Sequence, residues 1–325
     1  MSQQPHLVRP HLVPQRGVDA PRASRRTLLA GLVAAAVGGP LLSSAASGTA
    51  YATSADDLYN SNTDLYHSFL SSPDPADGEG KDFQRRFKRH QIEDTSKDGH
   101  PPYMLTTILA IHGGGIEVGT SELCMGIAGY DPESGAVWKP YPGLAAGEPV
   151  YDFWMFEGMR SSRNSELHVT SIHCDDHMAV SMAASSMNTL SIHGLKWEQA
   201  YPKYATNPDG LPDKKGVVVG GRDGYFREIL TTRLRNAGFQ IFPGTGDVNG
   251  DEELNICNRT MSKQGAQLEL TRELRDSFFS PTADSPAARA ASCKENASYK
   301  KFVQACRAAI VEREQLQRVE VFIGA

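Results

Sequence analysis

The stretch LTTILAIHGGGIEVGTSEL, residues 105–123, constrains this chain more than any other. Residues 105–111 are apolar or β-branched, which predicts a buried strand. His112 ends the strand, and Gly113 to Gly115 allow a sharp turn there. Glu117 follows on the same loop, at the carboxyl end of a strand, where open α/β sheets place their chemistry. Imidazole and carboxylate both bind Zn²⁺, so this stretch predicts part of a metal site.

The rest of the chain alternates between strand-like and helix-like segments. Strands are expected at 150–157, 167–173, 188–193, 217–220, 239–242 and 266–270. Helices are expected at 82–92, 176–186, 225–237, 272–279 and 299–318. An extended lead-in is expected at 53–80, a Pro/Gly-rich loop at 138–147 and a linker at 281–291. This alternation predicts an α/β fold with three layers, α/β/α, around a mixed, largely parallel sheet.

The first fifty residues have the pattern of a secretory signal. Arg25 and Arg26 precede an apolar run over residues 30–42, and the small residues Ala50-Tyr51-Ala52 follow as a cleavage site. The pattern predicts a twin-arginine signal over residues 1–52, and therefore a secreted protein that uses the twin-arginine export machinery. The apolar run is too short to span a bilayer comfortably, so we expect no stable membrane span in the mature form.

Charge argues against a nucleic-acid partner. The whole chain has a formal net charge of −5 and no basic segment interleaved with aromatic residues. Residues 1–52 carry five Arg and one Asp, so the chain after them has a net charge of −9. The 40% hydrophobic content is sufficient for a sizeable core.

A second strand ends as the first one does. The segment TLSIHGLKW places His193 after an apolar run and before Gly194, which makes His193 the candidate third ligand. Glu269, in GAQLELTRELR, lies near another strand end. A zinc hydrolase needs such a carboxylate, outside the ligand set, to take a proton from the attacking water.

Five segments together resemble the zinc-dependent poly-γ-glutamate hydrolases of bacteria and their phages. They are HGGGIEVGTSEL, SIHG, VVVGGRDGYF, NICNRT and GAQLEL, between about residues 100 and 280. The resemblance implies a carboxypeptidase-like α/β/α fold and cleavage of the γ-glutamyl amide bonds of poly-γ-glutamate. It implies His112, Glu117 and His193 as Zn²⁺ ligands and Glu269 as general acid/base. The predicted domains are a signal peptide (1–52), a lead-in (53–99), a zinc hydrolase domain (100–280) and a C-terminal helical extension (281–325).

Recognition of a polyanionic substrate requires local cations in an acidic chain. Arg222 lies between a strand and a helix N-terminus, and Arg259 lies in NICNRT. A guanidinium can hold a carboxylate through two parallel hydrogen bonds, so both are candidate substrate-binding residues. An ordinary surface ion pair is the alternative for each.

Other interpretations compete with this one. HGGG also occurs in the oxyanion loops of lipases and esterases, but the Gly-x-Ser-x-Gly nucleophile motif is absent. The His/Asp/Cys cluster at 168–177 is either a second metal site or a strand end followed by a helix capped by Asp175 or Asp176, and we favour the cap because no standard metal spacing is present. Cys293 and Cys306 are placed so that a disulfide is possible, although the pairing is not determined. There are two alternative functions. One is a zinc peptidase that acts on cell-wall or other γ-linked peptides, and the other is a non-catalytic polymer- or wall-binding module.

Overall fold

The computed structural model describes residues 57–89, 106–134, 138–142, 144–145, 148–200, 214–242, 244 and 246–323. The chain divides into Met1–Gly48 and Thr49–Ala325, and all the described residues belong to the second unit. The predicted signal at 1–52 therefore lies outside the described residues. Within the ranges given above, no helix combines the length and the apolar composition needed to cross a membrane.

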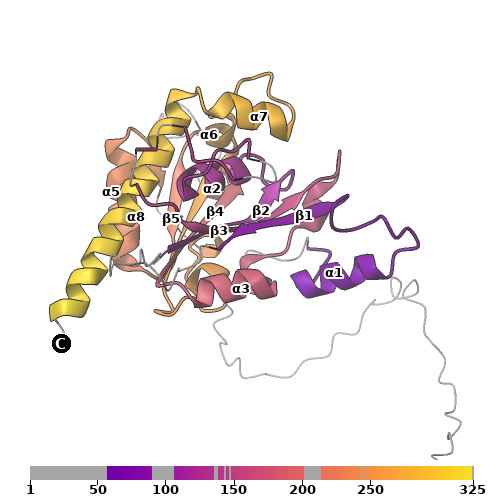
Figure 1. Ribbon diagram of the computed structural model, residues 1–325, viewed down its shortest axis with the longest axis horizontal. Coiled ribbons are helices and arrows are strands. Elements are labelled where there is room, and N and C mark those ends of the chain that lie inside the picture. Colours follow the sequence, from indigo (N-terminus) through magenta and orange to yellow (C-terminus); the bar gives the residue numbers. More distant parts are fainter. Residues whose placement is uncertain are drawn as a thin grey trace, which may run out of the picture. The chain divides into compact units, whose positions relative to one another are not determined.

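A seven-stranded sheet forms the centre of the molecule, in the order β1-β3-β2-β4-β7-β5-β6 (Figure 1). The strands are β1 (Phe83–Lys88), β2 (Thr106–Gly114), β3 (Asp152–Gly158), β4 (Asn188–Leu195), β5 (Val217–Gly220), β6 (Ile241–Phe242) and β7 (Ala266–Thr271). Neighbouring strands run parallel except for β1 against β3 and β5 against β7. The prediction of a mixed, largely parallel sheet is thus confirmed.

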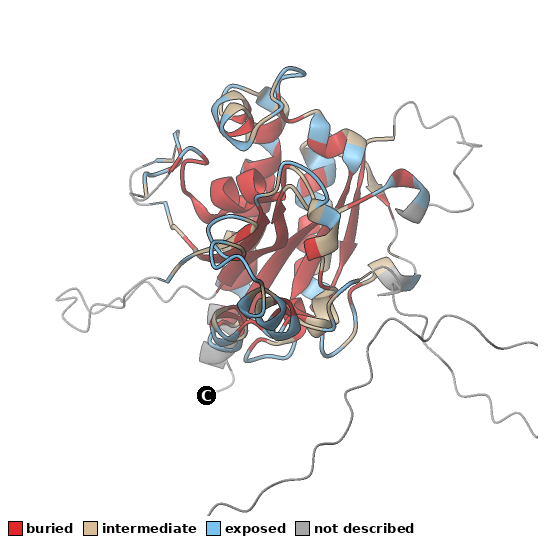
Figure 2. Ribbon diagram, turned by 90° about the vertical axis from the view of Figure 1, so that its right-hand side faces the viewer, coloured by how far each residue is buried: buried red, intermediate tan, exposed pale blue. Residues whose placement is uncertain are grey.

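Helices cover both faces of this sheet, which gives the three layers (Figures 1 and 2). The helices α2 (Thr120–Ala128), α5 (Gly224–Asn236) and α8 (Ala297–Ile323) pack on one face, and α1 (Asn62–Leu70) and α3 (His177–Ala184) on the other. The first core lies between the sheet and helices α2, α5 and α8, and the second core lies between the sheet and helices α1 and α3. Side chains along a strand alternate between the two: Ile108 and Ala110 pack in the first core, and Leu109 and Ile111 pack in the second.

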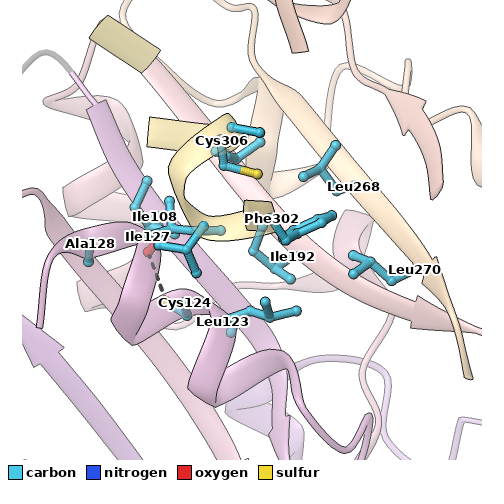
Figure 3. Packing of buried hydrophobic residues seen from close by; sticks show 14 of the residues in the cluster. Ile108, Leu123, Cys124, Ile127, Ala128, Ile192, Leu268, Leu270, Phe302 and Cys306 are labelled. Atoms are coloured by element: carbon cyan, nitrogen blue, oxygen red, sulfur yellow. Dashed lines mark hydrogen bonds between the residues drawn. The ribbon is translucent and has the colours of Figure 1, made fainter. Parts of the chain in front are cut away.

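The long helix α8 is part of the main core. Phe302 and Cys306 lie on the sheet against Ile192 and Leu268, close to α2 (Figure 3). The predicted linker at 281–291 is wrong in part, because the helix α7 (Pro286–Cys293) begins there. Ser285 accepts a hydrogen bond from the Ala288 amide and Pro286 occupies the first turn, a strong helix start.

Two predicted segments near the amino end have another structure. The lead-in contains helix α1, where the Ser61 side chain accepts from the Asp64 amide as N-cap. The helix expected at 82–92 is wrong, because Phe83–Lys88 forms strand β1. Its residues pair antiparallel with β3, and Phe83 packs in the second core, so tertiary pairing overrides the local pattern.

The segment 167–173 is also not a strand. Leu167 ends the 3₁₀ turn Asn164–Leu167, and a second 3₁₀ turn, Ser171–His173, follows a short extended piece. Asp176 caps α3 by accepting from the Met178 and Ala179 amides, which confirms the cap expected there. The remaining short elements are α4 (Trp197–Ala200), α6 (Arg272–Asp276), and the 3₁₀ turns Gly246–Val248 and Ile256–Asn258.

The five cysteines are free thiols, and all five are buried. Cys293 and Cys306, for which a disulfide was possible from the sequence, both belong to the main core as separate apolar side chains. Cys124 donates a weak hydrogen bond to the Ile108 carbonyl across 3.8 Å (Figure 3). The core therefore uses these residues as small hydrophobic groups.

A buried ion pair joins α5 to α8. The carboxylate of Asp223 caps α5 and accepts from Arg313 Nε at 2.9 Å, and both side chains are buried. We predict that Asp223→Ala costs about 3–5 kcal/mol of unfolding free energy, because it leaves the Arg313 charge buried without its partner. Urea denaturation measures the loss.

The matched control is Glu312→Ala, which breaks a second ion pair between the same two helices. Glu312 and Arg233 are paired at 2.7 Å but are 40% and 46% exposed. Its removal should cost under about 1 kcal/mol. Equal losses in the two variants would contradict the assigned role of burial.

Candidate metal centre

A bulge at the end of β2 directs the side chain of His112 toward the second core. The register between β2 and β3 shifts between Ala110 and Gly113. Ile111 already packs in the second core, and His112 Nε2 bonds to the Val169 carbonyl of that same core at 2.8 Å. Bulges often redirect a side chain beside an active site, because two successive residues then face one side of the sheet.

Strands β4 and β7 bring two more candidates to the same face. His193 and Glu269 are register partners in this parallel pair. Their neighbours Ile192, Leu268 and Leu270 all point into the opposite core. Alternation along each strand therefore places the imidazole and the carboxylate side by side on the face that His112 occupies.

The structure brings the three predicted ligands together. One ligand atom from each of His112, Glu117 and His193 lies within 4.8 Å of the others. Glu117 Oε1 lies 2.9 Å from His112 Nδ1, and Glu117 Oε2 accepts from the Gly194 amide at 2.8 Å. The tight turn between the first two ligands uses Gly114, which has a φ of +62° and no room for a Cβ beside the Gly158 carbonyl.

The outer nitrogen of each imidazole has its own partner. His112 Nε2 donates to the Val169 carbonyl, which leaves Nδ1 facing the cluster. His193 Nε2 lies 2.7 Å from the Ser191 hydroxyl, and its Nδ1 lies 3.3 Å from His112 Nδ1. Such outer contacts fix the tautomer and orientation of histidines that bind metals.

Burial and charge set the protonation of the three groups. Burial lowers the pKa of His193 to about 3, so this ring is neutral. Burial also lowers the pKa of His112, but the adjacent Glu117 carboxylate outweighs it and the net pKa is raised. Burial disfavours the charged form of Glu117, but His112 outweighs this and lowers its pKa to about 2.

This donor set fits Zn²⁺. Two imidazoles and one carboxylate are the ligands of many catalytic zinc sites, which keep a fourth position open. In both histidines Nε2 already has a partner, and the two Nδ1 atoms face each other. A cation is therefore the natural partner for both Nδ1 atoms. His112, Glu117 and His193 are therefore the residues that would hold the metal.

The candidate base Glu269 is hydrogen-bonded to a chain of two amide side chains, which was not predicted from the sequence. Its Oε1 accepts from Gln267 Nε2 at 3.2 Å, and Gln267 Oε1 accepts from Asn255 Nδ2 at 2.9 Å. Asn255 belongs to the NICNRT segment, which thereby supports the base from outside the sheet. Burial and the charge of Glu117 raise the pKa of Glu269 well above its usual value.

The two arginines proposed for the substrate have partners of their own. Arg222 Nη1 lies 3.8 Å from Glu253 Oε2 at an exposed position, and Arg259 Nη1 donates to the Cys174 carbonyl at 2.8 Å. Their role in substrate binding stays a prediction. A third arginine, Arg275, is buried across Gly194 and donates to the Val118 carbonyl at 2.5 Å, so it braces the Glu117 loop.

His168, from the cluster at 168–177 that was interpreted as a strand end and a capped helix, also lies at this site. Its ring stacks on His112 with centroids 3.8 Å apart, and its Nε2 lies 3.9 Å from Glu117 Oε1. Its partner is Asp57, far away in the sequence, at 2.6 Å. No local spacing could have signalled a pair whose members are so far apart.

Comparison with known proteins identifies the family. The sequence model of the family described as Poly-gamma-glutamate hydrolase matches residues 143–305. The chain belongs to this family. The match continues through α7 into α8, past residue 280, where the predicted hydrolase domain ends, and the predicted domain bounds stay a prediction.

Two proteins of Bacillus subtilis are similar in sequence to this chain. The chain is 32% identical over 174 residues to the SPbeta prophage-derived protein YoqZ of Bacillus subtilis, covering 53% of this chain and 51% of YoqZ. It is 29% identical over 187 residues to YndL of the same bacterium, covering 57% of this chain and 59% of YndL. The match thus spans only half to three-fifths of the length of these relatives.

Two solved structures share the fold. A bacteriophage poly-gamma-glutamate hydrolase is 25% identical with a TM-score of 0.57, and the match covers 80% of this chain and 99% of that one. A zinc-free apo structure of YndL is 26% identical with a TM-score of 0.55, covering 78% and 97%. These likenesses place the three-layer α/β architecture within the family.

We predict that His193→Ala loses metal binding, because two ligands cannot replace the buried three-ligand set. The control is His177→Ala, which alters an exposed histidine on α3. Metal content after zinc loading and dialysis, measured by elemental analysis, should fall to background in the first variant only. Full zinc occupancy in His193→Ala would refute the ligand assignment.

Proposed function

We propose that this chain is an exported, zinc-dependent hydrolase that cleaves the γ-glutamyl amide bonds of poly-γ-glutamate. The observation that carries the proposal is the cluster of His112, Glu117 and His193, with Glu269 on the adjoining strand, in a member of this family. The name of the phage hydrolase supports the substrate, and the zinc-free form of YndL supports the metal. A binding module would need no base beside its metal ligands.

The chemistry follows from the positions of these groups. Zinc supplies Lewis acidity for the scissile carbonyl and for water when it is bound by the three ligands. Glu269 takes a proton from the attacking water and delivers it to the leaving nitrogen as the C–N bond breaks. The hydrogen bond from Gln267 holds one carboxylate oxygen of Glu269, which leaves the other oxygen for the water.

We predict that Glu269→Gln keeps its metal and its fold but loses about 10²–10⁴-fold in turnover, since an amide cannot accept the proton. Glu228→Gln, an exposed change of the same chemistry on α5, is the control. Product sizing on poly-γ-glutamate and a zinc assay give the two readouts. Turnover close to that of the parent would assign the base to another residue.

The substrate assignment has a separate test. The zinc-loaded protein is incubated with poly-γ-glutamate, with α-linked polyglutamate and with γ-linked cell-wall peptides, and the products are sized. We expect the γ-linked polymer to be shortened and the α-linked polymer to remain intact. Cleavage of the wall peptides alone would replace this proposal with the zinc peptidase alternative.

Export rests on residues 1–52 alone. We predict that changing Arg25 and Arg26 together to Lys leaves the protein inside the producing cell, because the twin-arginine machinery recognises this pair. Immunoblots of the cell and medium fractions measure the distribution. Changing Arg16 and Arg22 to Lys is the control, and release of both variants into the medium would contradict twin-arginine export.

A further inference from the structure

A pocket of about 500 Å³ lies between α5 and the strands β5 and β6, and it shares no residue with the metal cluster. Val219 and Ile241 line it from the strands, and Arg227, Thr231 and Arg235 line it from the helix. These three helix residues follow one another at steps of four, so they lie along one side of α5. One wall of the pocket therefore carries two arginines.

Neither of these arginines has an acidic partner. Among the described residues, no carboxylate pairs with the guanidinium of Arg227 or of Arg235, and Arg227 Nε is buried without a hydrogen-bond partner. By contrast, Arg233 lies on the same helix outside the pocket and is paired with Glu312 at 2.7 Å. A buried donor without an acceptor is costly, and a charge-assisted contact is the strongest way to satisfy a guanidinium. The pocket therefore suits a ligand that carries negative charge.

We propose that this pocket is a second polymer site, in which Arg227 and Arg235 hold two carboxylates of poly-γ-glutamate away from the bond that is cleaved. The inference rests on the proposed function, because it extends the recognition of the same polymer beyond the metal cluster. Each guanidinium holds a carboxylate through parallel hydrogen bonds. Glu228 also lines the pocket, but its charge opposes a carboxylate, so it takes no part in holding the polymer.

The spacing of the two arginines fits a γ-linked chain. Arg235 follows Arg227 by eight positions, so their Cα atoms lie about 12 Å apart along the axis of α5. Each γ-glutamyl residue adds five backbone bonds, which span about 6 Å when extended. Because that number of bonds is odd, every second carboxylate of an extended chain points to the same side. Two such carboxylates are about 12 Å apart, which matches the two arginines.

The second polymer site also lies within reach of a chain bound at the metal cluster. β6 is an edge strand, and β7, which carries Glu269, lies two strands further in. Two strand spacings amount to about 10 Å, and passing from one face of the sheet to the other adds a similar distance. A chain that leaves the cluster round this edge therefore needs about four γ-glutamyl residues to reach the first arginine. Only longer polymers should gain affinity from the pocket.

Binding is tested directly in zinc-loaded Glu269→Gln, which should hold the polymer without cleaving it. We expect the Kd for poly-γ-glutamate, measured by calorimetry at low salt, to rise about tenfold or more when Arg227 and Arg235 are both changed to Gln. Arg235→Gln alone, at an exposed position, should raise it about threefold and serves if the double variant fails to fold. The control Arg233→Gln removes the same charge from the same helix and should leave Kd within about twofold.

Substrate length separates a binding role from a structural one. With Glu269 intact, the double arginine variant should lose kcat/KM on long polymers, mainly through a higher KM. The loss should shrink as the substrate becomes shorter and be smallest for the shortest γ-glutamyl oligomer that the parent cleaves. A variant with a disturbed fold would lose activity equally at every length. Glu228→Gln removes the opposing charge, so it should cleave the polymer at or above the rate of the parent.

NMR of ¹⁵N-arginine-labelled protein distinguishes the polymer from a small anion. The Nε–H signal of Arg227 is identified by its absence in Arg227→Gln. In zinc-loaded Glu269→Gln, this signal should shift when poly-γ-glutamate is added, and it should shift with inorganic phosphate only at a much higher concentration. Phosphate that binds as tightly as the polymer would make the pocket a site for small anions and overturn the inference.

Two further results would overturn the inference while leaving the proposed function intact. One is a polymer Kd that does not change when both arginines are replaced, and the other is a loss of kcat/KM that is independent of substrate length. A parent protein that cleaves no γ-linked polymer would instead refute the proposed function. The calorimetric comparison of the arginine variants would still decide separately whether the pocket holds the polymer.

Discussion

Two imidazole nitrogens that face each other across 3.3 Å in a buried site need a proton or a cation between them. Much of the surrounding structure serves to hold His112 and His193 in this position. The Val169 carbonyl and the Ser191 hydroxyl engage their outer nitrogens, and the Gly194 amide fixes Glu117 beside them. A site with so many fixed contacts is organised before any ligand arrives, which is what tight metal binding requires.

A small number of features of the sheet hold these residues in place. The bulge in β2 turns His112 to the face that His193 and Glu269 reach by simple alternation. Arg275 then crosses the bare backbone of Gly194 to reach Val118, which ties the loop of Glu117 to β7. A side chain at position 194 would collide with this guanidinium, so the glycine that ends the second His motif has a packing reason.

The sequence was informative where the chemistry depends on local pattern. Apolar runs ending in His-Gly predicted β2, β4 and the meeting of His112 with His193, because neighbouring parallel strands end at one edge. The sequence did not predict features that depend on contacts between segments far apart in the chain. Strand β1 is fixed by pairing with β3, and Asp57 reaches His168 across more than a hundred positions. Neither relation leaves a periodic or local trace, so neither could be predicted from one sequence.

Charge links the metal to the substrate in the proposed function. The described groups around the cluster include the carboxyl groups of Asp57, Glu117 and Glu269 and the guanidinium of Arg275. Arg222 and Arg259 are already paired with Glu253 and with a backbone carbonyl. Asp57 and Glu117, whose pKa values are lowered, stay ionised and repel a polymer with a carboxylate on every residue. A divalent cation offsets this repulsion, so metal loading would govern the binding of the polymer as well as its cleavage.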